Sequence, residues 1–143
     1  MKHYFLKSSA LLLTGLLVFS CSNPGPYVDG TYFGLSKSVY KSESFYGKVI
    51  VVVKNGHIFN VDFKIMDLGK NELFDDKYER HYAGNQTYID QCRNDWKGVL
   101  FYPVKLKERQ QIERVDAVSG ATWSYNLFAS SVKEAMKSAS VKK

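Results

Sequence analysis

A β-hairpin signal in residues 47–65 constrains the fold more than any other stretch of this chain. Residues 47–53 are a run rich in β-branched side chains, which is typical of a central strand. Asn55 and Gly56 follow, and both accept the positive φ angles of a type I′ turn. Beyond the turn, apolar side chains alternate with polar ones at Phe59, Val61, Phe63 and Ile65. This alternation predicts a return strand with one buried face and one solvated face.

Other periodic stretches place the remaining elements around this hairpin. Residues 30–36 are expected to form a first strand, and residues 39–45 a loop or an edge. Residues 121–139 are predicted to be helical, because apolar side chains share one stripe at Phe128, Val132, Ala135 and Ala139.

Residues 67–110 carry weaker signals. A spacing of four residues between Tyr88, Cys92 and Trp96 predicts a short amphipathic helix. Residues 99–102 suggest a short strand, and Pro103 is suited to the first turn of a separate helix that ends near Gln110.

The sequence as a whole predicts one α+β domain. A chain of 143 residues fits one domain with a substantial core. Ten Tyr and nine Phe favour β-structure and stacking surfaces over an architecture of long helices. We therefore expect an antiparallel sheet covered by a C-terminal helix and shorter helices.

The N-terminal residues predict export and lipid attachment. Residues 1–20 resemble a secretory signal, with Lys2 and Lys7 before an apolar run of residues 10–19 that is too short to span a bilayer. Residues 18–21 are similar to a lipoprotein cleavage box, which would make Cys21 the lipidated N-terminus. The alternative is an ordinary cleaved signal with an incidental cysteine. Residues 21–28 are expected to form a flexible tether, residues 29–139 the folded domain and residues 140–143 a basic tail.

Charge and cysteine content argue against several classes of protein. Of the formal net charge of +6, Lys2 and Lys7 belong to the signal segment, and the remaining charges are mixed. No basic stripe predicts nucleic-acid binding. If Cys21 is lipidated, Cys92 is left single and is either buried or a reactive thiol, and burial is the favoured interpretation. The histidines are scattered, so no metal site is expected.

The stretch from Asp116 to Ser124 carries the clearest functional signal. Ser119 is suited to cap a helix, and Gly120 permits a tight bend and a close approach to a ligand. The helix that follows would direct free N–H groups and a positive dipole end toward this bend. Taken alone, these features predict an anion site that contains the Thr122 hydroxyl, or else a plain helix cap.

Ser119-Gly120-Ala121-Thr122, with Asp116 before it, resembles the covalent flavin attachment motif of the FMN-binding domain family. Residues 29–34 and the hairpin are also similar to this family, which includes subunits of sodium-pumping and proton-pumping electron-transfer complexes. The resemblance implies that a flavin transferase splits FAD and leaves FMN as a phosphoester on Thr122. It also implies that Asp116 serves recognition by the transferase.

The resemblance implies a cofactor site made of Ser119, Gly120, Ala121 and Thr122, with Trp123 and Tyr125 either beside the flavin ring or in the core. It further implies an electron carrier that transfers electrons between a membrane redox partner and an external acceptor. Together with the predicted lipid on Cys21, this places the protein on a membrane, facing the periplasm or exterior. The chain lacks a Gly-rich dinucleotide motif and a nucleophile–base pair, so a self-sufficient oxidoreductase is not expected. The alternatives are a non-redox lipoprotein adaptor and a flavin-dependent reductase of a small acceptor.

Overall fold

The computed structural model describes residues 25–38 and 40–140. The predicted signal segment and Cys21 lie outside the described residues. The elements in chain order are β1 (Gly30–Lys37), β2 (Phe45–Lys54), β3 (His57–Asp67), β4 (Glu72–Leu73), the 3₁₀ helix η1 (Tyr78–Tyr82), α1 (Gln86–Arg109), the 3₁₀ helix η2 (Ile112–Arg114) and α2 (Thr122–Met136).

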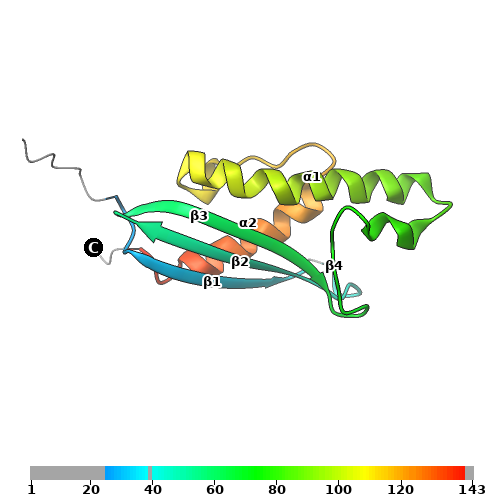
Figure 1. Cartoon of the computed structure of the whole chain (residues 1–143), viewed down its shortest axis with the longest axis horizontal. Coiled ribbons are helices and arrows are strands. Elements are labelled where there is room, and N and C mark those ends of the chain that lie inside the picture. The colour runs from blue at the N-terminus through cyan, green and yellow to red at the C-terminus, as the bar shows by residue number, and fades with distance from the viewer. Residues whose placement is uncertain (1–24, 39, 141–143) are drawn as a thin grey trace, which may run out of the picture.

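The four strands form one antiparallel sheet in the order β1-β2-β3-β4, and the fold is α+β as predicted. Both long helices lie on one side of the sheet, and no helix formed by the described residues covers its other face (Figure 1). Helix α2 contacts β1 and β2, whereas α1 contacts β3. The core between them is lined by side chains of the inner sheet face and of both helices, including Val49, Val51, Ile65, Tyr102, Leu106, Leu127, Phe128 and Val132.

The predicted hairpin is confirmed. Asn55 and Gly56 have φ angles of 53° and 73°, as a type I′ turn requires. The alternation in β3 holds for Val61, Phe63 and Ile65, but Phe59 is 56% exposed and Ile58 is buried in its place. A register irregularity between Val52 and Val53 causes this change, because an extra residue in one strand exchanges the two faces beyond it.

Helix α1 corrects the prediction of a strand over residues 99–102 and a separate helix from Pro103. It runs unbroken for 24 residues with Pro103 inside it, and it is longer than the 15-residue α2. Val99, Tyr102 and Leu106 lie on its buried face at helical spacing. Burial of this face outweighs the loss of one backbone hydrogen bond at the proline.

Helix α2 lies close to the sheet because β1 has a glycine at the contact. A Cβ atom on Gly34 would come within 1.9 Å of the Ser131 carbonyl oxygen. The hydroxyl of Ser36 donates a hydrogen bond of 2.7 Å to the Leu127 carbonyl oxygen. The helix ends at Met136 rather than at Ala139, although Ala139 is still buried.

Both ends of the described chain lie beside the hairpin turn (Figure 1). The Gly25 amide donates to the Asn55 carbonyl oxygen at 3.4 Å, and the Val28 amide donates to the Ala139 carbonyl oxygen at 2.8 Å. Gly25 to Val28, the C-terminal half of the segment predicted as a tether, therefore lie along the domain. Within the part of the chain that is described, neither helix is both long and apolar enough to cross a membrane.

Candidate functional site

A pocket of about 390 Å³ opens beside the N-terminus of α2, and Gly120 and Thr122 of the predicted motif line it. Aromatic side chains from four separate segments form most of its walls. The residues that line it are Tyr40, Glu43, Phe45, Phe74, Tyr78, Tyr82, Tyr88, Gln91, Cys92, Asp95, Gly120, Thr122 and Trp123. Such a volume and such apolar walls are typical of sites for drug-sized ligands.

The loop before α2 is fixed by side chains of α1. The Tyr102 hydroxyl donates to the Ala121 carbonyl oxygen at 2.9 Å and accepts from the Val118 amide at 3.1 Å. The Gln91 amide group donates to the Gly120 carbonyl oxygen at 2.8 Å. Gly120 has a φ of 78°, which confirms the predicted bend and which L side chains rarely adopt.

Asp95, and not Ser119, caps α2. Ser119 is exposed, the N-cap residue is Ala121, and no side chain at that position makes a capping bond. Instead, the buried Asp95 carboxylate accepts from the Ser124 amide at 3.0 Å and from the Ser124 hydroxyl at 2.8 Å. Burial raises the pKa of Asp95, and hydrogen bonds from Gln91 and Ser124 partly offset this rise. The predicted anion site thus already holds a carboxylate next to Thr122.

The other residues of the predicted site are divided between pocket and core. Gly120, Thr122 and Trp123 line the pocket, whereas Ala121 is buried in the core and does not line it. Tyr125 does not line it; its hydroxyl donates to the Val115 carbonyl oxygen at 2.7 Å and its ring packs on Tyr102. Of the two interpretations for Tyr125, the structure supports the core.

Trp123 joins an aromatic cluster on one wall of the pocket. Its ring centroid lies 5.0 Å from that of Phe45 and 5.2 Å from that of Phe74. Its indole N–H donates to the Glu43 carboxylate at 2.9 Å. These contacts fix the ring at the pocket wall. Tyr82 and Tyr88 form a second wall, with stacked rings 5.1 Å apart.

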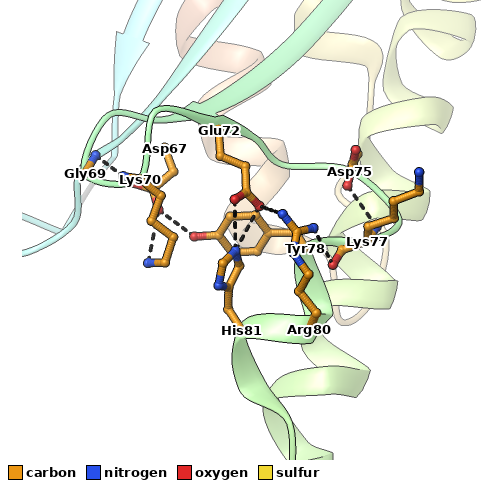
Figure 2. A network of polar contacts seen from close by, with 9 residues as sticks. All are labelled: Asp67, Gly69, Lys70, Glu72, Asp75, Lys77, Tyr78, Arg80 and His81. Carbon is orange, nitrogen blue, oxygen red and sulfur yellow. Dashed lines mark hydrogen bonds and ion pairs between the residues drawn. The ribbon is translucent and has the colours of Figure 1, made fainter.

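The segment that carries Tyr78 and Tyr82 is fixed to the end of β3 by a polar network (Figure 2). The Tyr78 hydroxyl donates to the Asp67 carboxylate at 2.6 Å, and the Gly69 amide donates to the same group at 2.8 Å. Glu72 accepts from the ring of His81 at 2.9 Å and pairs with Arg80 at 2.8 Å. Figure 2 shows the Tyr78 hydroxyl directed toward Asp67, and Glu72 directed toward His81 and Arg80.

Hydrogen bonds determine the ionisation of this network. Burial alone would raise the pKa of Asp67, but hydrogen bonds from Ser44, Tyr78, Gly69 and Lys70 hold it well below its ordinary value. Burial, together with the Asp67 charge, raises the pKa of Tyr78, so this hydroxyl stays protonated and keeps donating.

Cys92 is buried, as predicted, although it reaches the pocket lining. Burial, with the nearby charges of Asp95 and Glu79, raises the pKa of its thiol to about 11. The thiol is therefore protonated at neutral pH and is a poor nucleophile.

The sequence matches the FMN-binding domain family over residues 46–137, which is more than half of the chain. The chain belongs to this family. The match confirms the resemblance inferred from the Ser119 to Thr122 motif and identifies a flavin-binding protein.

Two solved structures are similar to this FMN-binding domain. A crystal structure of the CPE2226 protein from Clostridium perfringens is 20% identical, with a TM-score of 0.54, over 78% of this chain and 88% of that one. A solution structure from Clostridium thermocellum is 22% identical, with a TM-score of 0.45, over 76% and 89% of the two chains. The similarity to the Clostridium perfringens structure supports the assignment of the fold and nothing about function. None of the curated proteins matches the sequence.

The residues of the pocket fit a flavin. The aromatic walls suit a planar conjugated ring, and the volume suits a ligand of this size. Thr122 lines the pocket and is exposed. Asp116 is exposed and does not line the pocket, and its predicted role in transferase recognition stays a prediction.

The sequence missed most of the pocket. Tyr78, Tyr82 and Glu43 line it but belong to stretches without a clear periodic pattern. Asp95 lies in the stretch predicted as a short helix, but nothing in that pattern indicated that its carboxylate would reach α2. The abundance of Tyr indicated a stacking surface somewhere, but no pattern indicated where it would form.

Proposed function

We propose that this protein is an exported, lipid-anchored electron carrier that holds FMN as a phosphoester on Thr122. The observation that carries the proposal is the position of Thr122 at an aromatic pocket of flavin size. In this proposal, the flavin supplies the redox chemistry, whereas the protein binds and orients the ring.

The charge of the pocket supports covalent attachment. Two carboxylates, Glu43 and Asp95, line it, and the described lining residues include no Lys, Arg or His. A free FMN brings a phosphate of about −2 charge at neutral pH. Repulsion from two carboxylates would weaken its binding, and the Ser124 amide of α2 is already bonded to Asp95. A phosphoester bond holds the cofactor in spite of this repulsion.

The pocket is also accessible from outside, as a carrier requires. Tyr88 is 54% exposed and Tyr40 is 59% exposed, although both line the pocket. A flavin between these rings would keep one edge available to a redox partner. Transient redox complexes have small interfaces, so an open edge of this kind is sufficient.

Attachment is tested by replacing the acceptor hydroxyl. The full chain, co-expressed with a flavin transferase, is expected to gain the mass of a flavin phosphate and to fluoresce in a denaturing gel. Thr122→Ala is expected to lose both signals. Thr31→Ala, which removes an exposed hydroxyl in β1, is the matched control and should retain both. Flavin that remains covalently bound to Thr122→Ala would place the attachment elsewhere.

The carrier function is tested against the two alternatives. We expect the purified flavoprotein alone to oxidise NADH at most slowly, and we expect its flavin to become reduced when membranes that contain its partner are added. Rapid NADH turnover without membranes would indicate a reductase. Purified protein that never acquires flavin would indicate a non-redox adaptor.

A further inference from the structure

An open groove of about 820 Å³ lies at the end of the sheet farthest from the hairpin turn. Lys37 ends β1 and Lys48 lies on β2, while Lys41 comes from the loop between these strands. Leu35 and Leu68 complete the set that defines what we call the lysine groove. Ser36, next to Leu35 and Lys37, donates to α2, so its two neighbours point to the sheet face without helices.

The groove carries an unbalanced positive charge. Lys37, Lys41 and Lys48 form no ion pair with any residue in the described ranges. The one carboxylate in the lining, Glu43, already accepts hydrogen bonds from Trp123 and Ser38. Three cationic side chains therefore face solvent together.

This arrangement does not help the sheet to fold. Lys48 lies directly opposite Lys64 in the β2–β3 register, and like charges in that position destabilise a sheet. Leu35 and Leu68 are 61% and 66% exposed beside these charges. A combination of cationic and exposed apolar side chains is characteristic of a binding surface.

The lysine groove adjoins the flavin pocket. Glu43 and Phe45 line both cavities, so the Phe45 ring forms part of the partition between them. The Phe45 ring packs edge-on against Trp123 and Phe74 of the pocket wall. A protein in the groove would thus lie one aromatic side chain away from the flavin.

The position of the groove favours a protein over a lipid surface. Residues 30–34 of β1, at about 3.3 Å each, separate the groove from the hairpin end by roughly 17 Å. Gly25, the first described residue, lies at the hairpin end (Figure 1). With an anchor at Cys21, the groove would face away from the membrane. A concave surface also suits a protruding protein segment better than a flat layer of headgroups.

We propose that the lysine groove docks an acidic redox protein, whose carboxylates pair with Lys37, Lys41 and Lys48 while an apolar side chain contacts Leu35 and Leu68. This inference rests on the proposed electron-carrier function. Docking there brings the partner's redox centre beside the Phe45 partition, and positive charge accelerates the encounter with an acidic partner.

The first test uses an acidic flavodoxin as the probe and the full chain loaded with FMN. Stopped-flow absorbance measures the rate at which reduced flavodoxin gives one electron to the oxidised FMN. Replacing Lys37, Lys41 and Lys48 together with Glu is expected to lower the second-order rate constant about tenfold or more at low salt. The control changes Lys54, Lys107 and Lys133 to Glu; these residues are exposed, and none lines the groove. It alters net charge equally and should have a much smaller effect.

The second test measures binding without electron transfer. In an NMR titration of the flavin-free protein with flavodoxin, amide signals of residues 35–48 should shift, and those of the hairpin turn should not. These shifts should be lost in the groove variant and retained in the control variant.

The outcomes separate this inference from the function on which it rests. Reoxidation of the reduced flavin by a neutral quinone should be equally fast in all variants; absence of this reaction in the unaltered protein would refute the function. The docking proposal would be overturned if the quinone reaction is normal and both triple variants accept electrons from flavodoxin at the same rate. If the groove substitutions instead weaken binding to phosphatidylglycerol vesicles alone, the groove serves a lipid surface and the proposal is wrong.

Discussion

At the scale of single residues, two buried carboxylates organise the pocket. Asp67 accepts hydrogen bonds from donors on Ser44, Gly69, Lys70 and Tyr78, and this fixes the segment that supplies the Tyr78 wall. Asp95 performs the same task at the start of α2. Hydrogen bonds compensate each buried carboxylate, and Asp67 also pairs with the partly exposed Lys70 at 3.3 Å.

Asp67 should make the free energy of unfolding depend on pH in the acidic range. Its pKa lies below the value of about 3.9 found in unfolded chains, so its stabilising contribution is complete above that pH and decreases as pH falls below it. In Asp67→Asn, an uncharged amide replaces the carboxylate, and its NH₂ group cannot accept the hydrogen bonds that Asp67 accepts. This substitution should lower the free energy of unfolding by about 2 kcal/mol at neutral pH.

Urea denaturation at a series of pH values measures this effect. The difference between the unaltered protein and Asp67→Asn should shrink as pH falls below about 4. Asp62→Asn is the control, since Asp62 is exposed and its pair with Lys64 contributes little. A difference that stays constant with pH would show that the charge of Asp67 is not its source.

At the scale of elements, contact between α2 and β1 places the start of α2, and hence Thr122, relative to the sheet. This contact depends on the absence of a side chain at Gly34. The Ser131 carbonyl that would meet a Cβ there is part of the helix backbone and cannot rotate away. Any side chain at position 34 must move the helix or the strand.

Gly34→Ala should therefore destabilise the protein by roughly 1–3 kcal/mol, as overpacking of a core does. Thermal denaturation should show a lower Tm, and less flavin should be attached at Thr122 because α2 is displaced. Gly30→Ala in the same strand is the control, since a Cβ there would approach no atom closer than 3.3 Å. Equal Tm values for the two variants would contradict the close contact.

At the scale of the whole molecule, the ends of the sheet differ in role. The described chain begins and ends at the hairpin end (Figure 1). The residues that line the lysine groove come from the opposite end of the sheet. Gly25 follows Cys21 by four residues, which span at most about 14 Å when extended. An anchor at Cys21 would therefore keep the hairpin end close to the membrane and direct the groove toward the exterior.

Removing that anchor should release the domain. We expect Cys21→Ala to move the folded protein from the membrane fraction to the soluble fraction, because stable attachment requires more than one acyl chain and Cys21 is the predicted attachment site. Fractionation followed by immunoblotting measures the change. Cys92→Ala, which alters the buried cysteine, should remain in the membrane fraction. Retention of Cys21→Ala after a high-salt wash would mean that another segment holds the protein.

Local patterns in the sequence predicted the hairpin, the stripe of α2 and the motif at Thr122, because each depends on residues close together in the chain. The sequence did not predict that α1 continues through Pro103, since burial of Val99, Tyr102 and Leu106 against other elements decides it. Likewise, Asp95 replaces Ser119 as the cap of α2 only because α1 crosses beside that end. The pocket was decided by tertiary structure for the same reason: its walls come from the β1–β2 loop, the segment after β4, α1 and α2, and no local pattern reports which distant side chains will meet.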